Sequence, residues 1–436
     1  MRFSFSGASV RQGELMRSGR RIAVAIGVLV VLAIIVGVGR WYQLTHAAPG
    51  PTSAGLTAIV SNGNDRGPGS LREALFVVAS AKQPATISIE VPNIELETAL
   101  PPIITARGLT ITAGEAGAKI DAKALMGVPV LDVAGPNTSI EGVTIRNCSG
   151  SAIVLRADRF RLQRSAIESC DVGVDVAENA SEVLIEQNRF SANRIGVRLA
   201  GTTSNTSVVK NEFRGNKDAG LWAVRSAPDS TSSLVNVREN RFTDARNGLV
   251  VGNVALVIER NEIINATEAA VHVVGAGATV RGNRITGGAS MGIVAENATS
   301  AIIESNEIDG LAAYGIMVRG SSNTLVRQNR MHNCGFGMAF VLGAKGGPST
   351  AVENTVIEPK FNGIDVVGDS PILRGNQVLR PRGLALNVKD FSPPSGPTVQ
   401  SKPFLEKNTF GAPQGQPTGT SVATGTASRV DSAARP

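Results

Sequence analysis

The chain has 436 residues, of which 42% are hydrophobic, 18% are charged and only 4% are aromatic. So little charge excludes a charge-rich disordered protein and a long coiled coil. The formal net charge is +7, but residues 1–40 carry six arginines and one glutamate, and the other 37 basic and 35 acidic residues leave only +2, so bulk charge does not favour a nucleic-acid partner.

The first predicted element is a membrane-spanning helix. Residues 22–39 are 18 consecutive residues without a charged side chain, and at ~1.5 Å per residue they nearly span a bilayer core. Five arginines precede this run and only Arg40 follows it closely, so the positive-inside rule places residues 1–21 in the cytoplasm. The run is long for the alternative, a cleaved signal peptide. We therefore expect a single-pass anchor in a bacterial inner membrane, a flexible linker over 40–55 and a periplasmic domain.

The predicted folded domain, residues 56–410, begins with a short helix. Ser70 and Glu73 stand three residues apart in the segment SNGNDRGPGSLREAL, residues 61–75, and form a capping box that starts a helix near 71–80. Such a helix can cover the apolar end of a repeat array, whose uncovered edge strands would invite association. Residues 411–436 are rich in Pro, Gly, Thr, Ser and Ala and are predicted to form a disordered tail.

An internal repeat decides the predicted fold. The phrase apolar-x-x-Asn recurs, as in IEQNRF from Ile185, VRGNRI from Val280 and IESNEI from Ile303, and a second phrase, Gly-apolar-x-apolar, recurs in the same period, as at Gly173 and Gly315. Several short strands in each period of about 22 residues, with alternating inward and outward side chains, are typical of a parallel β-helix. Leucine-rich repeats have a similar length, but their leucine skeleton is missing.

The repeat asparagine falls at one position of each coil. Stacked coils would place these side chains about 4.8 Å apart, so an amide ladder can bridge neighbouring coils. Asparagine also tolerates the left-handed conformation that a sharp corner demands. We therefore interpret the following side chains as structural corner residues: Asn188, Asn211, Asn240, Asn261, Asn283, Asn306, Asn329 and Asn376.

These repeats cover roughly residues 130–410, and they resemble the right-handed parallel β-helix proteins of the pectate-lyase-like superfamily; residues 61–75 are similar to the entry segment of many such proteins. The resemblance implies an all-β solenoid and a carbohydrate ligand, because proteins of this fold commonly bind, cleave or epimerise long polysaccharides. The Asp-Pro-His-Asp motif of mannuronan epimerases and the paired-Asp and Gly-His-Gly motifs of polygalacturonases are missing. The sequence therefore leaves open whether the protein is an enzyme, of lyase or C5-epimerase type.

Two columns of outward residues differ in character. In the apolar-x-x-Asn strand the charges alternate in sign from Arg238 to Arg327, which is typical of a solvated face that opposite charges stabilise modestly. The outward position of the Gly-apolar-x-apolar strand follows no such order, and it carries Asp175, Arg198, Trp222, Val250, His272, Val294, Met317, Ala339, Asp365 and Ala385.

Insertions at 226–232, 343–349 and 389–402 follow the Gly-apolar-x-apolar strand, so they should wall a shallow groove along the second column. In the alternative, Trp222 and Met317 simply pack under these loops. The candidate substrate-binding residues are Asp175, Arg198, Trp222, His272, Tyr314, Arg319 and Asp365.

The three cysteines are too few for a disulfide framework. Cys148 and Cys170 stand 22 residues apart, near one coil, so they could form a disulfide or stack as small buried side chains, and we expect the stacking. No CxxC, HExxH or histidine cluster is present, so no metal or other cofactor is expected.

Two functions from different classes are compatible with these features. The first is a membrane-anchored periplasmic β-helix that binds a polysaccharide during exopolysaccharide or envelope-glycan assembly or export, and that modifies the polymer if it is an enzyme. The second is a non-catalytic scaffold whose partners are proteins of an envelope complex. Resemblance of fold does not separate the two.

Overall fold

The structure is a computed structural model and describes residues 55–114, 117–178, 180–200, 203–225, 235–288, 291–413 and 422–427. The predicted anchor at 22–39, the basic segment before it and nearly all of the linker lie outside these residues. Within the described ranges, no helix is both long enough and apolar enough to cross a membrane.

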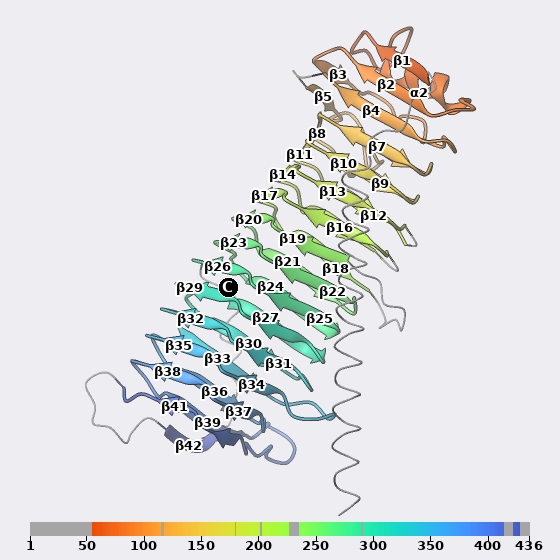
Figure 1. Cartoon of the computed structure of the whole chain (residues 1–436). Coiled ribbons are helices and arrows are strands. Elements are labelled where there is room, and N and C mark those ends of the chain that lie inside the picture. Colours follow the sequence, from red (N-terminus) through yellow and green to blue (C-terminus); the bar gives the residue numbers. More distant parts are fainter. Residues whose placement is uncertain are drawn as a thin grey trace, which may run out of the picture. The chain divides into compact units, whose positions relative to one another are not determined.

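Three long sheets wind together into a solenoid, in which each strand pairs in parallel with the equivalent strand one coil earlier and one coil later (Figure 1). From β3 onward, consecutive strands of the chain belong to different sheets, so a complete coil contributes one strand to each sheet. Phe190 on one coil, for example, lies beside Phe213 on the next, 23 residues later. The predicted β-helix with about 22 residues per coil is confirmed.

The first sheet carries the apolar-x-x-Asn phrase. Its 15 described strands are β1 (Leu56–Val60), β2 (Ala85–Ile89), β4 (Leu109–Ala113), β7 (Thr138–Glu141), β10 (Arg161–Gln163), β13 (Leu184–Glu186), β16 (Thr206–Val209), β19 (Val235–Arg238), β22 (Leu256–Glu259), β25 (Ala278–Arg281), β28 (Ile302–Glu304), β31 (Leu325–Arg327), β34 (Thr350–Val352), β37 (Ile372–Arg374) and β40 (Phe404–Glu406).

The second sheet follows the repeat asparagine in each coil. Its 14 described strands are β3 (Asn93–Glu95), β5 (Ala118–Asp121), β8 (Val143–Arg146), β11 (Ala166–Glu168), β14 (Arg189–Ser191), β17 (Glu212–Arg214), β20 (Arg241–Thr243), β23 (Glu262–Ile264), β26 (Arg284–Thr286), β29 (Glu307–Asp309), β32 (Arg330–His332), β35 (Thr355–Ile357), β38 (Gln377–Leu379) and β41 (Thr409–Phe410).

The third sheet carries the Gly-apolar-x-apolar phrase. Its 13 described strands are β6 (Leu131–Val133), β9 (Ser151–Leu155), β12 (Val172–Val176), β15 (Ile195–Leu199), β18 (Ala219–Val224), β21 (Asn247–Gly252), β24 (Ala269–Ala276), β27 (Met291–Thr299), β30 (Tyr314–Arg319), β33 (Phe336–Val341), β36 (Ile364–Val367), β39 (Leu386–Phe391) and β42 (Val422–Ala427). Because β42 pairs with β39, this part of 411–436 is a strand and not the predicted disordered tail.

The one helix among the described residues, α2 (Leu71–Ala79), lies against β1 and β2 at the start of the solenoid. The Oγ of Ser70 accepts a hydrogen bond from the backbone N–H of Glu73 at 3.3 Å, which confirms the predicted N-cap. The Glu73 carboxylate in turn accepts from the N–H of Gly69, one residue before the position that a capping box implies. The buried residues of α2 are Leu71, Ala74, Leu75 and Val78.

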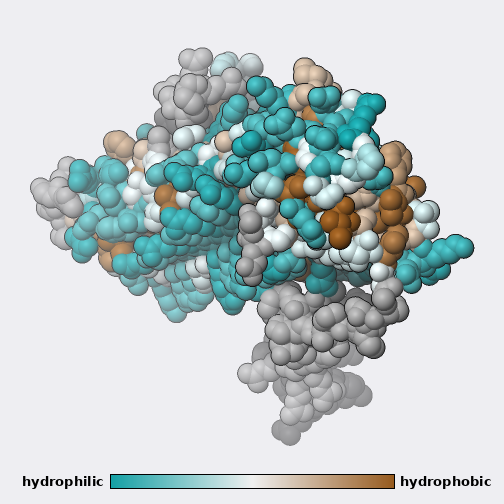
Figure 2. Space-filling view, turned by 90° about the horizontal axis from the view of Figure 1, so that it is seen from above, coloured by the Kyte–Doolittle hydropathy of each residue, from teal (hydrophilic) through white to brown (hydrophobic). Residues whose placement is uncertain are grey.

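Asp65 connects helix α2 to the segment that contains Thr98 by hydrogen bonds. Its carboxylate accepts from Arg72 at 2.8 Å and from the hydroxyl of Thr98 at 2.7 Å. Burial acts to raise the pKa of Asp65, but the hydrogen bonds from Thr98 and Arg72 outweigh it and hold that pKa well below its usual range. Seen from above, the molecule has a mainly hydrophilic surface with smaller hydrophobic patches (Figure 2). The apolar side chains exposed at the start of the solenoid include Ile59 and Phe76.

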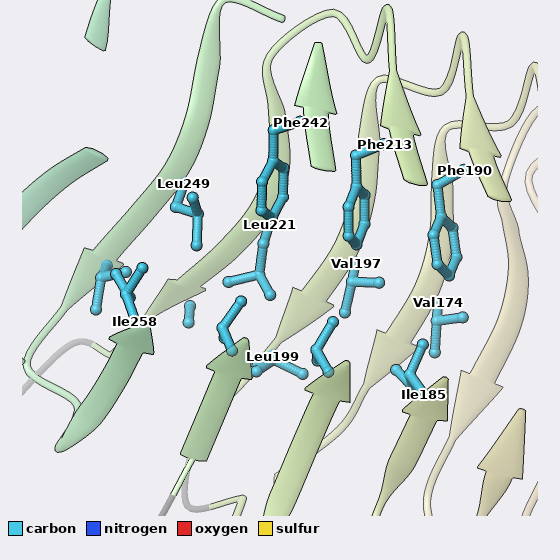
Figure 3. Close-up of a cluster of buried hydrophobic side chains, with 14 of the residues drawn as sticks. Val174, Ile185, Phe190, Val197, Leu199, Phe213, Leu221, Phe242, Leu249 and Ile258 are labelled. Carbon is cyan, nitrogen blue, oxygen red and sulfur yellow. The ribbon is translucent and has the colours of Figure 1, made fainter. Parts of the chain in front are cut away.

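Inward side chains stack from coil to coil and form one continuous core. Phe190, Phe213 and Phe242 lie in a row with ring centroids 4.9 and 4.6 Å apart, and apolar residues of the third sheet face them (Figure 3). A side chain at Gly220 would place its Cβ 2.4 Å from Cδ1 of Phe242. The repeat glycine is therefore explained by the close approach of the aromatic ring.

The repeat asparagines form the predicted amide ladder. Both the backbone N–H and Nδ2 of Asn283 donate to Oδ1 of Asn306 at 3.0 Å, and the same pattern recurs along the buried row. The prediction that these asparagines adopt the left-handed conformation was wrong. The residue before each asparagine adopts that conformation instead, for example the exposed Gln187 (φ 57°) and Ser305 (φ 54°). The amide ladder holds the buried asparagine in place, so the turn is made by the residue before it.

Cys148 and Cys170 form a disulfide between neighbouring coils, with Cα atoms 4.3 Å apart. The expectation of two stacked free thiols was therefore wrong, because equivalent positions of adjacent coils bring the two sulfur atoms within bonding reach. Cys334 is free and buried, and burial raises the pKa of its thiol to about 11.

Candidate functional site

All seven candidate residues lie on strands of the third sheet, and most share one outward column. The strand registers align Asp175, Arg198 and Trp222, and they continue through His272 to Asp365. Tyr314 and Arg319 flank this column on β30, at the two ends of the strand.

The predicted column is wrong at its last member. Asn387, and not Ala385, lies beside Asp365. The phrase that begins at Gly383 resembles the repeat, but Gly383 is not the residue equivalent to Gly363. Because Ile364 pairs with Leu386, the equivalent residue is Ala385, two positions later. The alignment by glycines therefore selected Ala385 in place of Asn387.

In the N-terminal part of the column, Asp175 and Arg198 form an ion pair. Arg198 donates from Nε to Oδ1 of Asp175 at 2.7 Å, and this hydrogen bond raises the pKa of Arg198. Trp222 lies beside Arg198 on the next coil and is partly exposed. Asp175 and Arg198 therefore engage one another, and Trp222 adds a partly exposed indole beside them.

The middle of the column holds a second polar cluster. His272 Nε2 lies 3.2 Å from Glu296 Oε2, and Arg319 Nη1 lies 3.8 Å from Glu296 Oε1. Glu296 was missed by sequence reasoning because it lies two positions beyond the column, opposite Arg319 in the register. This trio presents both donors and acceptors on three consecutive coils.

Three aromatic rings, two on the third sheet and one in the turn before β36, stack near the C-terminal end of that sheet. The ring centroids of Tyr314 and Phe336 are 4.5 Å apart, and those of Phe336 and Phe361 are 4.9 Å apart. Tyr314 and Phe336 are partly exposed, and Phe361 is 53% exposed. The sequence held a signal for Phe336, because it directly precedes a repeat glycine as Tyr314 does, but Phe361 lies in the turn before β36 and carries no repeat signature.

Asp365 lies close to these rings and is only 5% exposed. Its Oδ1 accepts from Nδ2 of Asn362 at 2.9 Å and from Nδ2 of Asn387 at 2.7 Å. Burial raises the pKa of Asp365 despite these two hydrogen bonds. Burial, together with the charge of Asp365, also raises the pKa of the Tyr314 phenol.

Of the two described insertions, 343–349 follows the end of β33, and 389–402 begins within β39 and continues beyond it. In the insertion at 343–349, the backbone oxygen of Gly346 accepts from Asn323 on the preceding coil at 2.9 Å. In the insertion at 389–402, Phe391 and Val399 pair in an antiparallel bridge. The third insertion, at 226–232, lies outside the described residues.

An open hollow of about 880 Å³ lies elsewhere, at the corner between the first and second sheets. It is lined by residues that include Glu141, Arg164 and Lys210. Arg164 already pairs with Glu141, and no aromatic side chain lines the region. Nowhere in the described ranges do three or more His, Cys, Asp or Glu side chains form a group that could hold a metal ion.

Two overlapping segments, residues 122–231 and 228–378, match the model of the right-handed beta helix region. The chain belongs to the right-handed β-helix family. Among solved β-helix structures, it is similar to the A-module of a mannuronan C-5 epimerase from Azotobacter vinelandii, with 14% identity and a TM-score of 0.59 over 81% of this chain and 98% of that chain.

The β-helix is also similar to the catalytic unit of an α-1,3-glucanase from Streptomyces thermodiastaticus, with 13% identity and a TM-score of 0.53 over 83% of this chain and 70% of that chain. It is similar as well to the tailspike protein of Escherichia coli bacteriophage HK620 in complex with a pentasaccharide, with 11% identity and a TM-score of 0.52 over 77% and 74%. At these identities the likeness establishes the fold. No curated protein sequence matches the chain.

Proposed function

We propose that this β-helix binds a polysaccharide along the outward face of the third sheet. The observation that carries the proposal is the partly exposed stack of Tyr314, Phe336 and Phe361 beside the carboxyl group of Asp365. Exposed aromatic surface, here including the edges of the stacked rings, can contact the apolar C–H surface of sugar rings, and amide, carboxylate and guanidinium groups bind sugar hydroxyls. The similar solved proteins, which are named for mannuronan, α-1,3-glucan and a bound pentasaccharide, support this ligand class.

The layout favours a polymer over a small sugar. From His272 on β24 to Asp365 on β36 there are four coil spacings, or about 19 Å at ~4.8 Å each. A ligand that engages both ends must therefore be long and must run along the solenoid axis. Val294 and Ala339 lie between the polar groups in the register of the column, and both are buried.

Removing the aromatic platform should weaken glycan binding without unfolding the protein. We expect Phe336→Ala combined with Phe361→Ala to raise the dissociation constant for a bound polysaccharide at least ~10-fold, because exposed apolar contact area is lost. The matched control is Arg281→Ala combined with Arg327→Ala on the first-sheet charge ladder, where each arginine pairs with the neighbouring glutamate.

Affinity electrophoresis in gels that contain the polysaccharide, together with thermal melting, measures both effects. Loss of binding in the ladder pair but not in the aromatic pair would move the site to the first sheet. If no polysaccharide is bound while the protein still supports its pathway, the scaffold for envelope proteins becomes the better explanation.

We further propose that residues 22–39 anchor the protein in a bacterial inner membrane, with the β-helix in the periplasm, where it acts in exopolysaccharide or envelope-glycan assembly or export. The support is the arginine asymmetry around the apolar run. A periplasm-active reporter fused after residue 430 should be active, and the protein should fractionate with membranes. Activity of a cytoplasm-specific reporter at that position would refute the orientation, and a mature N-terminus near Ala48 would convert the anchor into a signal peptide.

A further inference from the structure

We propose that the N-terminal end of the solenoid docks on the surface of a lipid bilayer through apolar side chains of helix α2. The inference rests on the proposed anchoring of the chain by residues 22–39, and it adds a contact surface in the folded domain. The surface is formed by Phe76 and Val77 of α2 and by Ile59 on the neighbouring strand β1. Its partner is the boundary between the headgroups and the acyl chains of the membrane.

Helix α2 is apolar on two faces. Residues 74–79 are six consecutive apolar residues, ALFVVA, and only one face of a helix can point into the core. The side chains on the buried face are Leu71, Ala74, Leu75 and Val78. Phe76 and Val77 remain 62% and 45% exposed. Since a helix that only caps a soluble solenoid needs a polar outer face, the second apolar face requires a partner.

Large exposed apolar side chains are concentrated at this end of the solenoid. Five of the nine in the described part of the chain lie between residues 59 and 126, and none of the described residues between 127 and 360 adds another. The five are Ile59, Phe76, Val77, Ile104 and Met126. Single apolar residues scattered over a surface need no explanation. These are not scattered, because the whole middle of the solenoid separates them from the other four.

The exposed apolar residues at the C-terminal end have local causes that do not apply to α2. Leu405 is an inward residue, exposed because β40 is the last described strand of the first sheet, and Phe361 ends the row of stacked rings. At the N-terminal end the core is already closed, since α2 packs against β1 and the inward Val60 has no exposed surface. Phe76 and Val77 are therefore not the open end of a core.

The course of the chain indicates a membrane as the partner. Residues 40–55 are 16 residues that join the proposed anchor to β1, and fully extended they span about 55 Å. The tether therefore holds this end of the solenoid within that distance of the bilayer surface. A short tether gives a second contact a high effective concentration, so a small apolar surface is enough to keep the end docked.

The charges around α2 are compatible with an apolar contact. The Glu73 carboxylate accepts from the N–H of Gly69, and the Asp65 carboxylate accepts from Arg72, so both acidic groups between residues 61 and 82 are engaged. Lys82, three residues beyond the end of α2, is exposed and forms no ion pair with a described residue. Its long side chain is suited to place the ammonium group at lipid phosphates.

The test places the full-length protein in lipid nanodiscs that hold one copy each, made of phosphatidylethanolamine and phosphatidylglycerol with brominated acyl chains. A fluorophore is attached at Phe76→Cys or, as the matched position at the other end, at Phe404→Cys, where the native side chain is 56% exposed. The native cysteines do not react, because Cys148 and Cys170 are bonded and Cys334 is buried. Relative to unbrominated lipid, we expect the fluorescence at residue 76 to fall at least ~2-fold and that at residue 404 to stay unchanged.

A second set of variants tests the apolar face itself. With the fluorophore at Val77→Cys, the additional change Phe76→Ser should remove most of the quenching, because a polar side chain replaces the inserted ring. The matched change Phe404→Ser should leave the quenching intact. Since Phe76 and Phe404 are both exposed, neither change should shift the melting temperature by more than a few degrees.

Each result decides the inference. Protein that enters the nanodiscs without quenching at residue 76, or with equal quenching at residues 76 and 404, would overturn the docking and leave the anchor intact. Quenching that persists in Phe76→Ser would also overturn it, because the contact would not depend on the apolar face. Protein that does not enter the nanodiscs at all would overturn the anchor and the docking together, while polysaccharide binding on the third sheet is measured separately.

Discussion

Replacing Ile303 by aspartate is expected to unfold the central coils of the solenoid. Ile303 has no exposed surface and lies between Val280 and Val326 in the inward ladder of the first sheet. A carboxylate at this position has no partner, and burying it costs several kcal/mol, a large fraction of the ~5–15 kcal/mol by which folded domains are stable. The denaturant midpoint should fall sharply, as followed by circular dichroism.

The control is the next residue along the strand. Glu304 points outward and accepts from Nε of Arg327 at 2.7 Å, so Glu304→Gln removes only a solvated ion pair and should cost less than ~1 kcal/mol. Comparable losses for the two variants would mean that the inward and outward positions are exchanged, because a shift of one residue turns every side chain of a strand to the opposite face.

Replacing Asn283 by leucine should also be strongly destabilising. Its Nδ2 donates to the backbone oxygen of Ile258 at 3.0 Å, and its Oδ1 accepts from the backbone N–H of Asn261 at 3.0 Å. Leucine fills a similar volume but leaves both buried backbone groups without partners. At about 1–3 kcal/mol for each unsatisfied group, we expect a loss of about 2–6 kcal/mol in the free energy of unfolding.

The matched control for Asn283→Leu is Asn236→Leu. Asn236 lies on β19 with its side chain outward and partly exposed, so this change should shift the free energy of unfolding by less than ~1 kcal/mol. Equal effects at the two positions would show that the stability depends on asparagine content in general and not on the buried ladder.

The fold could be predicted because each coil repeats the same local constraints. Inward apolar residues, the buried asparagine and the repeat glycine recur in nearly every period, so the structure of one coil can be predicted from its alignment with the next. The repeat could not show which residue of a corner makes the turn. The residue before the asparagine takes the left-handed conformation at Gln187 and at Ser305, and no single residue type marks that position.

The site could be predicted only as far as the register could be followed. The outward column from Asp175 to Asp365 was correctly aligned because a Gly-apolar-x-apolar phrase marks the position of each strand there, even where an insertion lengthens the coil. Asn387 was missed, since the phrase at Gly383 resembles the repeat and shifted the alignment by two residues. Phe361 was missed because it lies in a turn. The neighbours that hold Asp365 therefore came from pairing between coils and could not be read from local sequence.

The most direct test of the central claim is a crystal structure of the protein with a bound oligosaccharide of the polymer that it binds most tightly. The account predicts sugar rings along the outward face of the third sheet, parallel to the solenoid axis, with one ring against Phe336 and Phe361 and another near Asp365 and Tyr314. Sugar density on the first-sheet charge ladder, or in the hollow lined by Arg164 and Lys210, would contradict it.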